Sequence, residues 1–327
     1  MSLPALVAPD SFKGTFGAAA VAAAIARGLR AGGREAIELP VADGGEGTIE
    51  VLCRALGGEL REATVPDPLG RPVRAVFALL DGGATAVVEV AQASGLGLVP
   101  EPERDPVAAS THGTGELIAA AAGCGAGRVL VAACGSATVD GGAGALAALA
   151  EADARPRLTV LCDVRTPWEE AAATFGPQKG ADPEQVRRLA RRLARMAERA
   201  PRDPRGRAMT GAAGGLAGGL WAHHGAELVG GAAFVLGAIG FDARMRESAF
   251  AVTGEGSLDR QTLQGKAAGE VATRCRQGGV ACHAIVGHDG LEPFEARILD
   301  LSTVTEATTI AELERAGRAL ARGRASA

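Results

Sequence analysis

A carboxylate, a hydroxyl, an ammonium group and a glycine follow the first apolar stretch of the chain. They belong to the segment 8–14, Ala-Pro-Asp-Ser-Phe-Lys-Gly, which comes directly after the apolar run 3–7. In open α/β sheets ligands bind at the carboxyl ends of strands, and the N-terminus of a following helix favours an anion. Asp10 can hold a metal ion or accept a proton, and Lys13 supplies a point charge for a phosphate. The segment therefore raises the question of a phosphate-handling site.

Four further polar, glycine-rich loops stand where a strand or helix is expected to end. They are the segments 43–48, 135–142, 175–180 and 253–266. Together the five loops hold carboxylates, lysines and hydroxyl groups flanked by glycine. Phosphoryl transfer needs cations and backbone N–H groups for the phosphates, carboxylates for magnesium and a base near the attacking hydroxyl. One such loop is ordinarily a turn, but five in one chain favour this chemistry.

The chain lacks the short motifs of several other enzyme classes. It has no Gly-x-x-x-x-Gly-Lys-Ser/Thr, because Arg260 stands where that pattern requires a glycine. It has no Gly-x-Gly-x-x-Gly in a dinucleotide-binding context and no Gly-x-Ser-x-Gly. No two histidines stand at metal-binding spacing, so we interpret all five as structural or peripheral. His112 stays open as a candidate, because it precedes Gly-Thr-Gly-Glu.

Composition limits the classes of partner. The chain has 327 residues, enough for two domains, and a net charge of −4, which argues against nucleic-acid or membrane binding. We therefore interpret the arginines of the helix expected over 182–199 as a solvated face. The six cysteines form no Cys-x-x-Cys pair and are interpreted as small buried hydrophobes in a reducing compartment. No basic n-region or long apolar run opens the chain, so we expect a cytoplasmic protein.

The start of the chain is typical of a parallel sheet. Apolar strands alternate with amphipathic helices over 3–7, 17–30, 35–40 and 49–56. Three shorter apolar segments separated by turn sequences then predict an antiparallel meander, over 60–65, 72–80 and 84–90. This change of pattern places a domain boundary near residue 65.

The remainder returns to strands and helices. Helices are expected over 115–122, 143–150, 182–199, 267–276 and 310–322, and strands over 128–133, 158–162, 250–252 and 282–286. The segment 211–226 is expected to form a Gly/Ala helix or a pair of turns. Because the chain starts and finishes in α/β units, we predict a discontinuous domain, 1–65 plus 250–327, around an inserted domain, 66–249.

In their order along the chain, these loops resemble those of the bacterial glycerate kinase family, the type that phosphorylates the 2-hydroxyl. The matching segments span nearly the whole chain: 8–14, 42–48, 93–96, 110–118, 135–144, 162–164, 175–181, 211–215 and 253–266. The resemblance implies an α/β protein with a Rossmann- or flavodoxin-like parallel-sheet domain, an inserted mixed α/β domain and an active site in the cleft between them. It also implies that ATP and Mg²⁺ phosphorylate D-glycerate, giving ADP and 2-phosphoglycerate.

The resemblance also assigns candidate residues. Three carboxylates are candidates for binding magnesium or acting as the general base: Asp10, Asp43 and Asp163. Lysines are candidates for holding phosphates or the substrate carboxylate: Lys13, Lys179 and Lys266. The other candidate binding residues are Ser11, Gly44, Gly45, Glu46, Ser94, Thr114, Ser136, Thr138, Asp140, Gly141, Gln178, Glu255, Asp259 and Gln261. The expected partners are glycerate and ATP, with a homo-oligomer left open.

Three departures from the family pattern keep alternatives open. Val139 stands where the family usually has Asn, the region 150–158 is shorter than in relatives, and 165–170 replaces the usual Asn-Pro-Leu. Two alternatives are a kinase for a related small hydroxy acid and a weakened or non-catalytic sugar-acid sensor. A nucleotide-dependent oxidoreductase is a third, against which the missing dinucleotide motif argues. Replacing Val139 by Asn is expected to leave activity intact.

Overall fold

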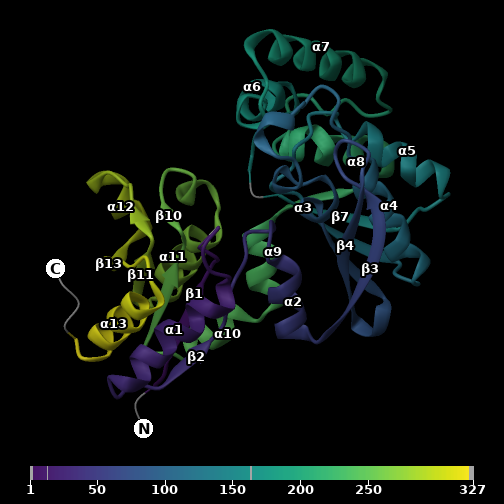
Figure 1. The fold of residues 1–327 in the computed structure, drawn as a ribbon. Coiled ribbons are helices and arrows are strands. Elements are labelled where there is room, and N and C mark those ends of the chain that lie inside the picture. The colour runs from purple at the N-terminus through teal and green to yellow at the C-terminus, as the bar shows by residue number, and fades with distance from the viewer. Residues whose placement is uncertain (1–2, 13, 163, 324–327) are drawn as a thin grey trace. The chain divides into compact units, whose positions relative to one another are not determined.

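The computed structural model describes residues 3–12, 14–162 and 164–323. It divides into two compact units (Figure 1). Unit 1 is made of Met1–Asp43 and Ala232–Ala327, and unit 2 of Gly44–Gly231. Each unit combines a β-sheet with packed helices. Unit 1 therefore uses both ends of the chain, and unit 2 uses the middle.

Unit 1 is built on a five-stranded sheet in which every pairing is parallel. In spatial order the strands are β13 (Leu301–Glu306), β11 (Cys282–Val286), β9 (Phe250–Gly254), β1 (Ala5–Pro9) and β2 (Ala36–Glu38). Counted along the chain, this is the flavodoxin-like order, and it reverses between β1 and β9. Ligands in such sheets bind at the carboxyl ends of the strands beside the reversal.

Helices cover the sheet of unit 1. The pair α1 (Ala18–Ala31) and α13 (Ile310–Ala321) lie side by side and share a core with Val7, Val252 and Ile285 (Figure 1). Helix α11 (Ala267–Gly278) packs against β1, β9 and β11. All five residues of β1 are buried, as expected for a parallel strand with both faces covered. The smaller elements are α9 (Gly231–Ala238), α10 (Phe241–Arg246), α12 (Pro293–Leu299), β10 (Ser257–Leu258), β12 (His288–Asp289) and η7 (Thr262–Gln264).

Unit 2 is built on a six-stranded mixed sheet. In spatial order its strands are β3 (Gly58–Pro66), β4 (Pro72–Leu80), β5 (Thr85–Glu89), β6 (Arg128–Ala132), β7 (Arg157–Cys162) and β8 (Glu227–Gly230). The first three strands pair antiparallel, and the later pairings are parallel. The predicted meander is therefore confirmed, and it continues into a parallel half.

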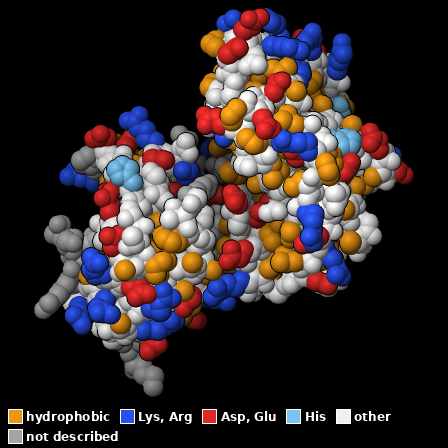
Figure 2. Space-filling model, viewed as in Figure 1, with side chains coloured by type: hydrophobic (Ala, Val, Ile, Leu, Met, Phe, Trp, Pro, Cys, Tyr) orange, Lys and Arg blue, Asp and Glu red, His pale blue; other side chains and the backbone are white. Residues whose placement is uncertain are grey.

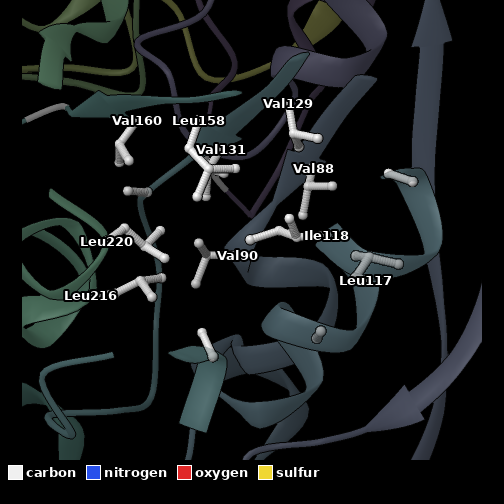
Figure 3. Packing of buried hydrophobic residues seen from close by; sticks show 14 of the residues in the cluster. Val88, Val90, Leu117, Ile118, Val129, Val131, Leu158, Val160, Leu216 and Leu220 are labelled. Atoms are coloured by element: carbon white, nitrogen blue, oxygen red, sulfur yellow. The ribbon is translucent and has the colours of Figure 1, made fainter. Parts of the chain in front are cut away.

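The core of unit 2 lies between this sheet and three helices. They are α4 (His112–Gly123), α5 (Ala143–Glu151) and α8 (Leu216–His224). Figure 3 shows Val131 and Leu158 from the sheet directed toward the same interior as Leu216 and Leu220. The remaining elements of unit 2 are α2 (Thr48–Leu56), α3 (Val90–Ser94), α6 (Ala171–Phe175), α7 (Pro183–Arg199), η1 (Asp81–Gly83), η2 (Leu96–Leu98), η3 (Glu101–Glu103), η4 (Trp168–Glu170), η5 (Pro177–Lys179) and η6 (Ala212–Gly215).

Helix α7 begins where its sequence predicts. The carboxylate of Asp182 accepts hydrogen bonds from the backbone N–H groups of Glu184 and Gln185, at 2.7 and 2.8 Å. The Gln185 side chain accepts from the Asp182 backbone in return, which completes a capping box. One face of the helix buries Leu189 and Leu193. The capping box therefore fixes the start of α7, and the apolar face packs the helix against the rest of unit 2.

The sequence-based boundaries near residues 65 and 250 differ from the division in the structure. The chain leaves unit 1 after residue 43 and returns at residue 232. The reason is that α2 packs on β3, β4 and β5, and so belongs with the meander rather than with β2. Strand β13 and helix α12 were not expected from the sequence.

The described residues contain no helix that combines the length and the apolar character needed to cross a bilayer. All six cysteines are free thiols. Cys162, Cys275 and Cys282 are buried, as expected for small hydrophobes, whereas Cys124 is exposed.

Candidate active site

A cavity of about 410 Å³ opens in unit 1 at the carboxyl ends of the parallel strands. Five of the predicted site residues line it: Asp10, Ser11, Asp43, Glu255 and Lys266. The other lining residues are Phe12, Thr15, Gly256, Ser257, Gly287, His288 and Thr308. Since β1 and β9 are the strands where the order reverses, the cavity occupies the place where this fold binds ligands.

Two aspartates of the cavity follow strands of the sheet: Asp10 comes directly after β1, and Asp43 lies beyond the end of β2. The backbone N–H of Asp10 donates to the carbonyl oxygen of Gly254 at 2.8 Å, which ties the end of β1 to the end of β9. One oxygen of the Asp10 carboxylate accepts from the Ser11 backbone N–H at 2.6 Å. Asp10 and Asp43 are 5 % and 2 % exposed. Both carboxylates are thus buried in a polar cavity wall.

Glu255 is the most strongly perturbed carboxyl group of the cavity. It directly follows β9 and is 6 % exposed. Burial raises the pKa of Glu255 to about 7, and the charges of Asp259 and Asp43 add to the rise. A hydrogen bond from the Thr262 hydroxyl, at 2.6 Å, and the charge of Lys266 oppose it. Glu255 therefore changes protonation near neutral pH.

Lys266 brings a positive charge to this group of carboxylates. Its Nζ lies 3.9 Å from Glu255 Oε2 and 3.8 Å from Asp259 Oδ1. The residue stands at the N-cap of α11. Asp259 and Gln261 belong to the same loop, where the Gln261 backbone N–H donates to Asp259 Oδ1 at 2.7 Å. Neither of these two residues lines the cavity, so they support the loop that carries Lys266.

His288 and Thr308 are cavity residues that the sequence did not indicate. We interpreted all histidines except His112 as structural or peripheral, yet His288 lines the cavity just after β11. Its Nδ1 lies 3.1 Å from Glu306 Oε1, at the end of β13. The position of His288 after the apolar strand β11 could have indicated its place in the cavity, because polar residues directly after apolar strands meet at one edge of a parallel sheet. Thr308 was not predicted because it follows β13, a strand that the sequence did not indicate.

A second group of predicted residues gathers in unit 2 around Lys179. This lysine is buried, and its Nζ donates to Ser136 Oγ at 2.9 Å and to the carbonyl oxygen of Thr138 at 2.7 Å. The Thr138 hydroxyl is buried and has no hydrogen-bond partner within the described structure. The lysine thus orders the loop 135–142 and keeps a charge beside two hydroxyl groups.

The predicted residues Ser94 and Thr114 form a buried pair. Their hydroxyl oxygens lie 2.7 Å apart. Ser94 ends α3 and Thr114 lies in the first turn of α4. His112, on the same turn, approaches Glu116 at 3.2 Å and Glu151 at 3.8 Å. These contacts give His112 a peripheral structural role.

Asp140 organises the same loop from within. Its two carboxylate oxygens accept from the backbone N–H groups of Thr111, Gly142 and Gly144, and from the Thr111 hydroxyl. The neighbouring Gly141 has φ +65°, and a Cβ there would lie 2.8 Å from the Trp168 ring. Asp140 and Gly141 therefore shape this loop.

The remaining predicted residues fall outside both groups. Gly44 and Gly45 are buried in unit 2, and Gly44 has φ +90° with its backbone against Gly231, where a Cβ would lie 2.6 Å from the Gly231 Cα. Glu46 and Gln178 are exposed. Two further predicted residues, Lys13 and Asp163, lie outside the described residues.

Comparison with known proteins identifies the family of this chain. A model of the Glycerate kinase family matches residues 5–156 and 150–324. The chain belongs to the Glycerate kinase family. The glycerate kinase of Bacillus subtilis (strain 168) is 39 % identical over 324 residues, covering 86 % of this chain and 84 % of that protein.

Two further relatives of the family extend the comparison. The glycerate 2-kinase of Escherichia coli (strain K12) is 38 % identical over 300 residues, covering 80 % of this chain and 79 % of that protein. A crystal structure from Salmonella typhimurium LT2, described as glycerate kinase 2, shares 34 % identity and a TM-score of 0.82. It covers 99 % of this chain and 97 % of that one, so the two-unit α/β fold extends over the whole alignment.

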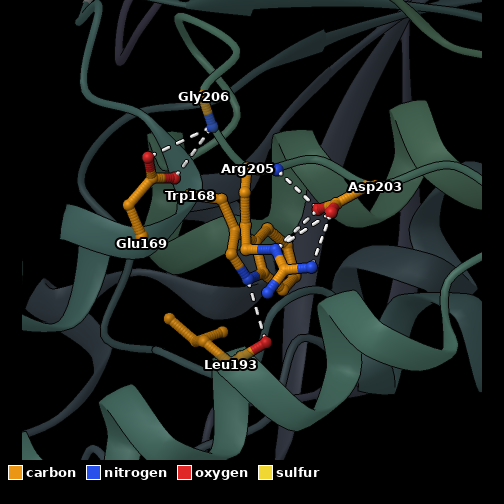
Figure 4. Close-up of polar contacts among 6 residues, drawn as sticks. All are labelled: Trp168, Glu169, Leu193, Asp203, Arg205 and Gly206. Atoms are coloured by element: carbon orange, nitrogen blue, oxygen red, sulfur yellow. Dashed lines mark hydrogen bonds and ion pairs between the residues drawn. The ribbon is translucent and has the colours of Figure 1, made fainter.

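Two of the departures from the family pattern meet in one apolar cluster. Val139 is fully buried in a cluster that includes Trp168 and Leu193. The Trp168 indole N–H donates to the carbonyl oxygen of Leu193 at 2.9 Å (Figure 4). Beside it, both carboxylate oxygens of Glu169 accept from the Gly206 backbone N–H (Figure 4). Trp168 of the segment 165–170 therefore packs in the same cluster as Val139.

This packing changes the expectation for Val139→Asn. The substitution would place an amide in the cluster, and a buried polar group without partners costs about 1–3 kcal/mol. We expect the variant to lower the free energy of unfolding by that amount, measured by urea unfolding. Val139→Thr, which keeps the shape and adds one hydroxyl, should fall between the wild type and Val139→Asn. A Val139→Asn protein as stable as the wild type would show that the loop repacks to hydrate the amide.

The raised pKa of Glu255 predicts a pH-dependent stability. The folded state binds the Glu255 proton up to about pH 7, whereas the unfolded state releases it near 4.5. The free energy of unfolding therefore falls as pH rises through this window, and Glu255→Gln removes the loss. Relative to the wild type, the variant should gain up to about 3 kcal/mol between pH 4.5 and pH 8.

Urea unfolding of both proteins at several pH values measures this gain. Glu35→Gln serves as the control, because Glu35 is an exposed carboxylate of the same unit. It should leave the pH dependence of the wild type unchanged. Parallel stability curves for wild type and Glu255→Gln would contradict a proton held by Glu255.

Proposed function

We propose that this protein transfers the terminal phosphate of ATP to the 2-hydroxyl of D-glycerate, with Mg²⁺ as the metal. The observation that carries the proposal is the cavity of unit 1, in a chain of the Glycerate kinase family. Buried carboxylates and a lysine line it at the carboxyl ends of the parallel strands. These are the groups that phosphoryl transfer requires, since it depends mainly on positioning and charge stabilisation.

The carboxylates of the cavity fit a magnesium ion. Mg²⁺ is usually bound by one or two carboxylates together with substrate phosphates, rather than by a complete protein cage. Asp10 and Asp43 would hold it, with Asp163 as a further candidate outside the described residues. When bound, the ion neutralises charge that develops on the phosphate oxygens.

Lys266 would hold the phosphates of the nucleotide. Its ammonium group lies beside Glu255 and Asp259 at distances of 3.8–3.9 Å, which are longer than direct hydrogen bonds. Its donors can therefore serve a ligand while the carboxylates hold the side chain in place. Ser11 and Ser257 add hydroxyl groups to the same wall, and Lys13 is a second candidate cation.

The polar loop 135–142 would bind the glycerate. A carboxylate is recognised by hydroxyl and backbone N–H donors that carry no competing negative charge. Ser136 and Thr138 offer hydroxyl groups, and Lys179 supplies a buried positive charge beside them. Asp140 does not oppose an incoming anion directly, because backbone N–H groups and the Thr111 hydroxyl already bind its oxygens.

We also propose that the protein acts in the cytoplasm. All six cysteines are free thiols, and thiols persist in reducing compartments. The reaction uses ATP, which is consistent with the same compartment.

The proposed activity is tested by measuring ADP release from ATP with D-glycerate, L-glycerate and related hydroxy acids, with and without Mg²⁺. Phosphorus NMR of the product identifies the phosphorylated oxygen. We expect release with D-glycerate only when Mg²⁺ is present, and phosphate on the 2-oxygen. ADP release with another hydroxy acid alone would show that glycerate is not the substrate. Phosphate on the 3-oxygen would contradict phosphorylation of the 2-hydroxyl. A folded protein that releases no ADP with any of the acids would favour a non-catalytic sensor.

Replacing Asp43 tests whether the unit 1 cavity performs the reaction. Asp43→Asn removes one negative charge from the proposed magnesium site, and we expect kcat to fall by about 10²-fold or more, by analogy with the loss of single electrostatic groups. The Mg²⁺ concentration for half-maximal rate should rise. Asp153→Asn is the control, because the exposed side chain of Asp153 pairs with Arg155 at the surface. An Asp43→Asn enzyme with normal kcat and Mg²⁺ dependence would exclude Asp43 from the site.

A further inference from the structure

A small cavity in unit 2 is lined by three arginines of α7. It has a volume of about 170 Å³, and Arg188, Arg192 and Arg195 line it together with Val107 and Leu189. The three arginines stand four and three residues apart, the spacing that places side chains on one helix face. Figure 2 shows basic side chains gathered over α7. Among the residues that the structure describes, no carboxylate lines this cavity.

Arg192 carries its charge into a partly buried position. Its Nη1 donates to the carbonyl oxygen of Val107 at 2.9 Å, and its Nη2 donates to the carbonyl oxygen of Val139. Its Nε is buried and has no hydrogen-bond partner in the described structure. Both acceptors are neutral, so they orient the guanidinium group without neutralising it.

The nearest acidic groups do not pair with Arg192. Asp140 and Asp105 attract it only through space, while the charge of Arg188 repels it, and burial lowers the pKa of the Arg192 guanidinium. The carboxylate of Asp105 accepts instead from the backbone N–H groups of Val107 and Ala108. Within the described part of the chain, no ion pair forms to the three arginines of the cavity. A partly buried positive charge without an ion-pair partner is unfavourable, and an anion would relieve it.

We propose that this cavity binds a small, free phosphate-bearing anion. Guanidinium groups present parallel N–H donors that match the oxygens of a phosphate. Three arginines line this cavity: Arg192 is partly buried, and Arg188 and Arg195 are exposed. The cavity is smaller than the roughly 300–1,000 Å³ of pockets for drug-sized ligands, so it suits a single phosphate group better than a nucleotide. This site is separate from the groups assigned to the kinase reaction, and the proposal does not rest on that reaction.

The bound anion is linked to the loop 135–142 through Arg192. The same guanidinium group lines the cavity and donates to the carbonyl oxygen of Val139. Val139 lies between Thr138, whose carbonyl oxygen accepts from Lys179, and Asp140. Occupancy of the cavity therefore holds Arg192 in place and stabilises this loop.

Calorimetric titration with inorganic phosphate at constant ionic strength tests the binding. Arg188→Gln/Arg195→Gln removes two of the three cavity arginines and leaves the hydrogen bonds of Arg192 intact. We expect its affinity for phosphate at this site to fall by about tenfold or more, since two of the three charged donors of the cavity are lost. Arg187→Gln/Arg199→Gln, which makes the same charge change on exposed residues of α7, should bind phosphate as the wild type does.

Three results would overturn the proposal: a wild type that binds no phosphate, equal binding by wild type and Arg188→Gln/Arg195→Gln, or an equal response to chloride. Hydrogen exchange over residues 135–142 tests the link to the loop. Phosphate should slow exchange there in the wild type and in Arg187→Gln/Arg199→Gln, but not in Arg188→Gln/Arg195→Gln. Exchange unaffected by bound phosphate would refute the link.

Discussion

The pairing of β1 with β9 is the constraint on which unit 1 depends. It joins Ala5–Pro9 to Phe250–Gly254 in parallel, although the whole of unit 2 separates them along the chain. This pairing completes the central part of the sheet and creates the reversal of strand order. Because both strands end at the same edge, Asp10 and Glu255 become neighbours in one cavity. The chemistry of unit 1 therefore depends on a backbone ladder between distant segments.

Local sequence patterns predicted the parts of the structure that depend on residues close to one another along the chain. The cap at Asp182, the meander and most strands with continuous apolar runs were predicted, because periodicity and turn residues act within a few positions. Strand β13 was missed, since its alternating pattern Leu-Ser-Thr-Val-Thr-Glu gains meaning only beside β11. His288 was not predicted as a cavity residue for the same reason. The boundary at residue 43 was not predicted because it depends on the packing of α2 against the meander.

The two groups of polar residues solve the problem of burial differently. In unit 1 buried carboxylates face a cavity, and one of them, Glu255, stays partly protonated near neutral pH because its charge is poorly solvated. In unit 2 Asp140 is equally buried but satisfied by backbone N–H groups, and it serves the loop. Residue type alone did not separate these roles. The decisive difference is where the hydrogen-bond donors lie, which only the folded arrangement reveals.

The contact between Gly44 and Gly231 has a consequence for how the chain assembles. These glycines are the first and last residues of unit 2, and their backbones touch. Once unit 2 has folded, the two chain segments that connect it to the two parts of unit 1 start from nearly the same point. The segment 44–231 is then no longer a flexible loop, because folding of unit 2 has already brought its two ends together. Unit 1 can assemble as if its two parts were joined by a short connection. An insertion of this size thus adds little to the entropic cost of forming the sheet that it interrupts.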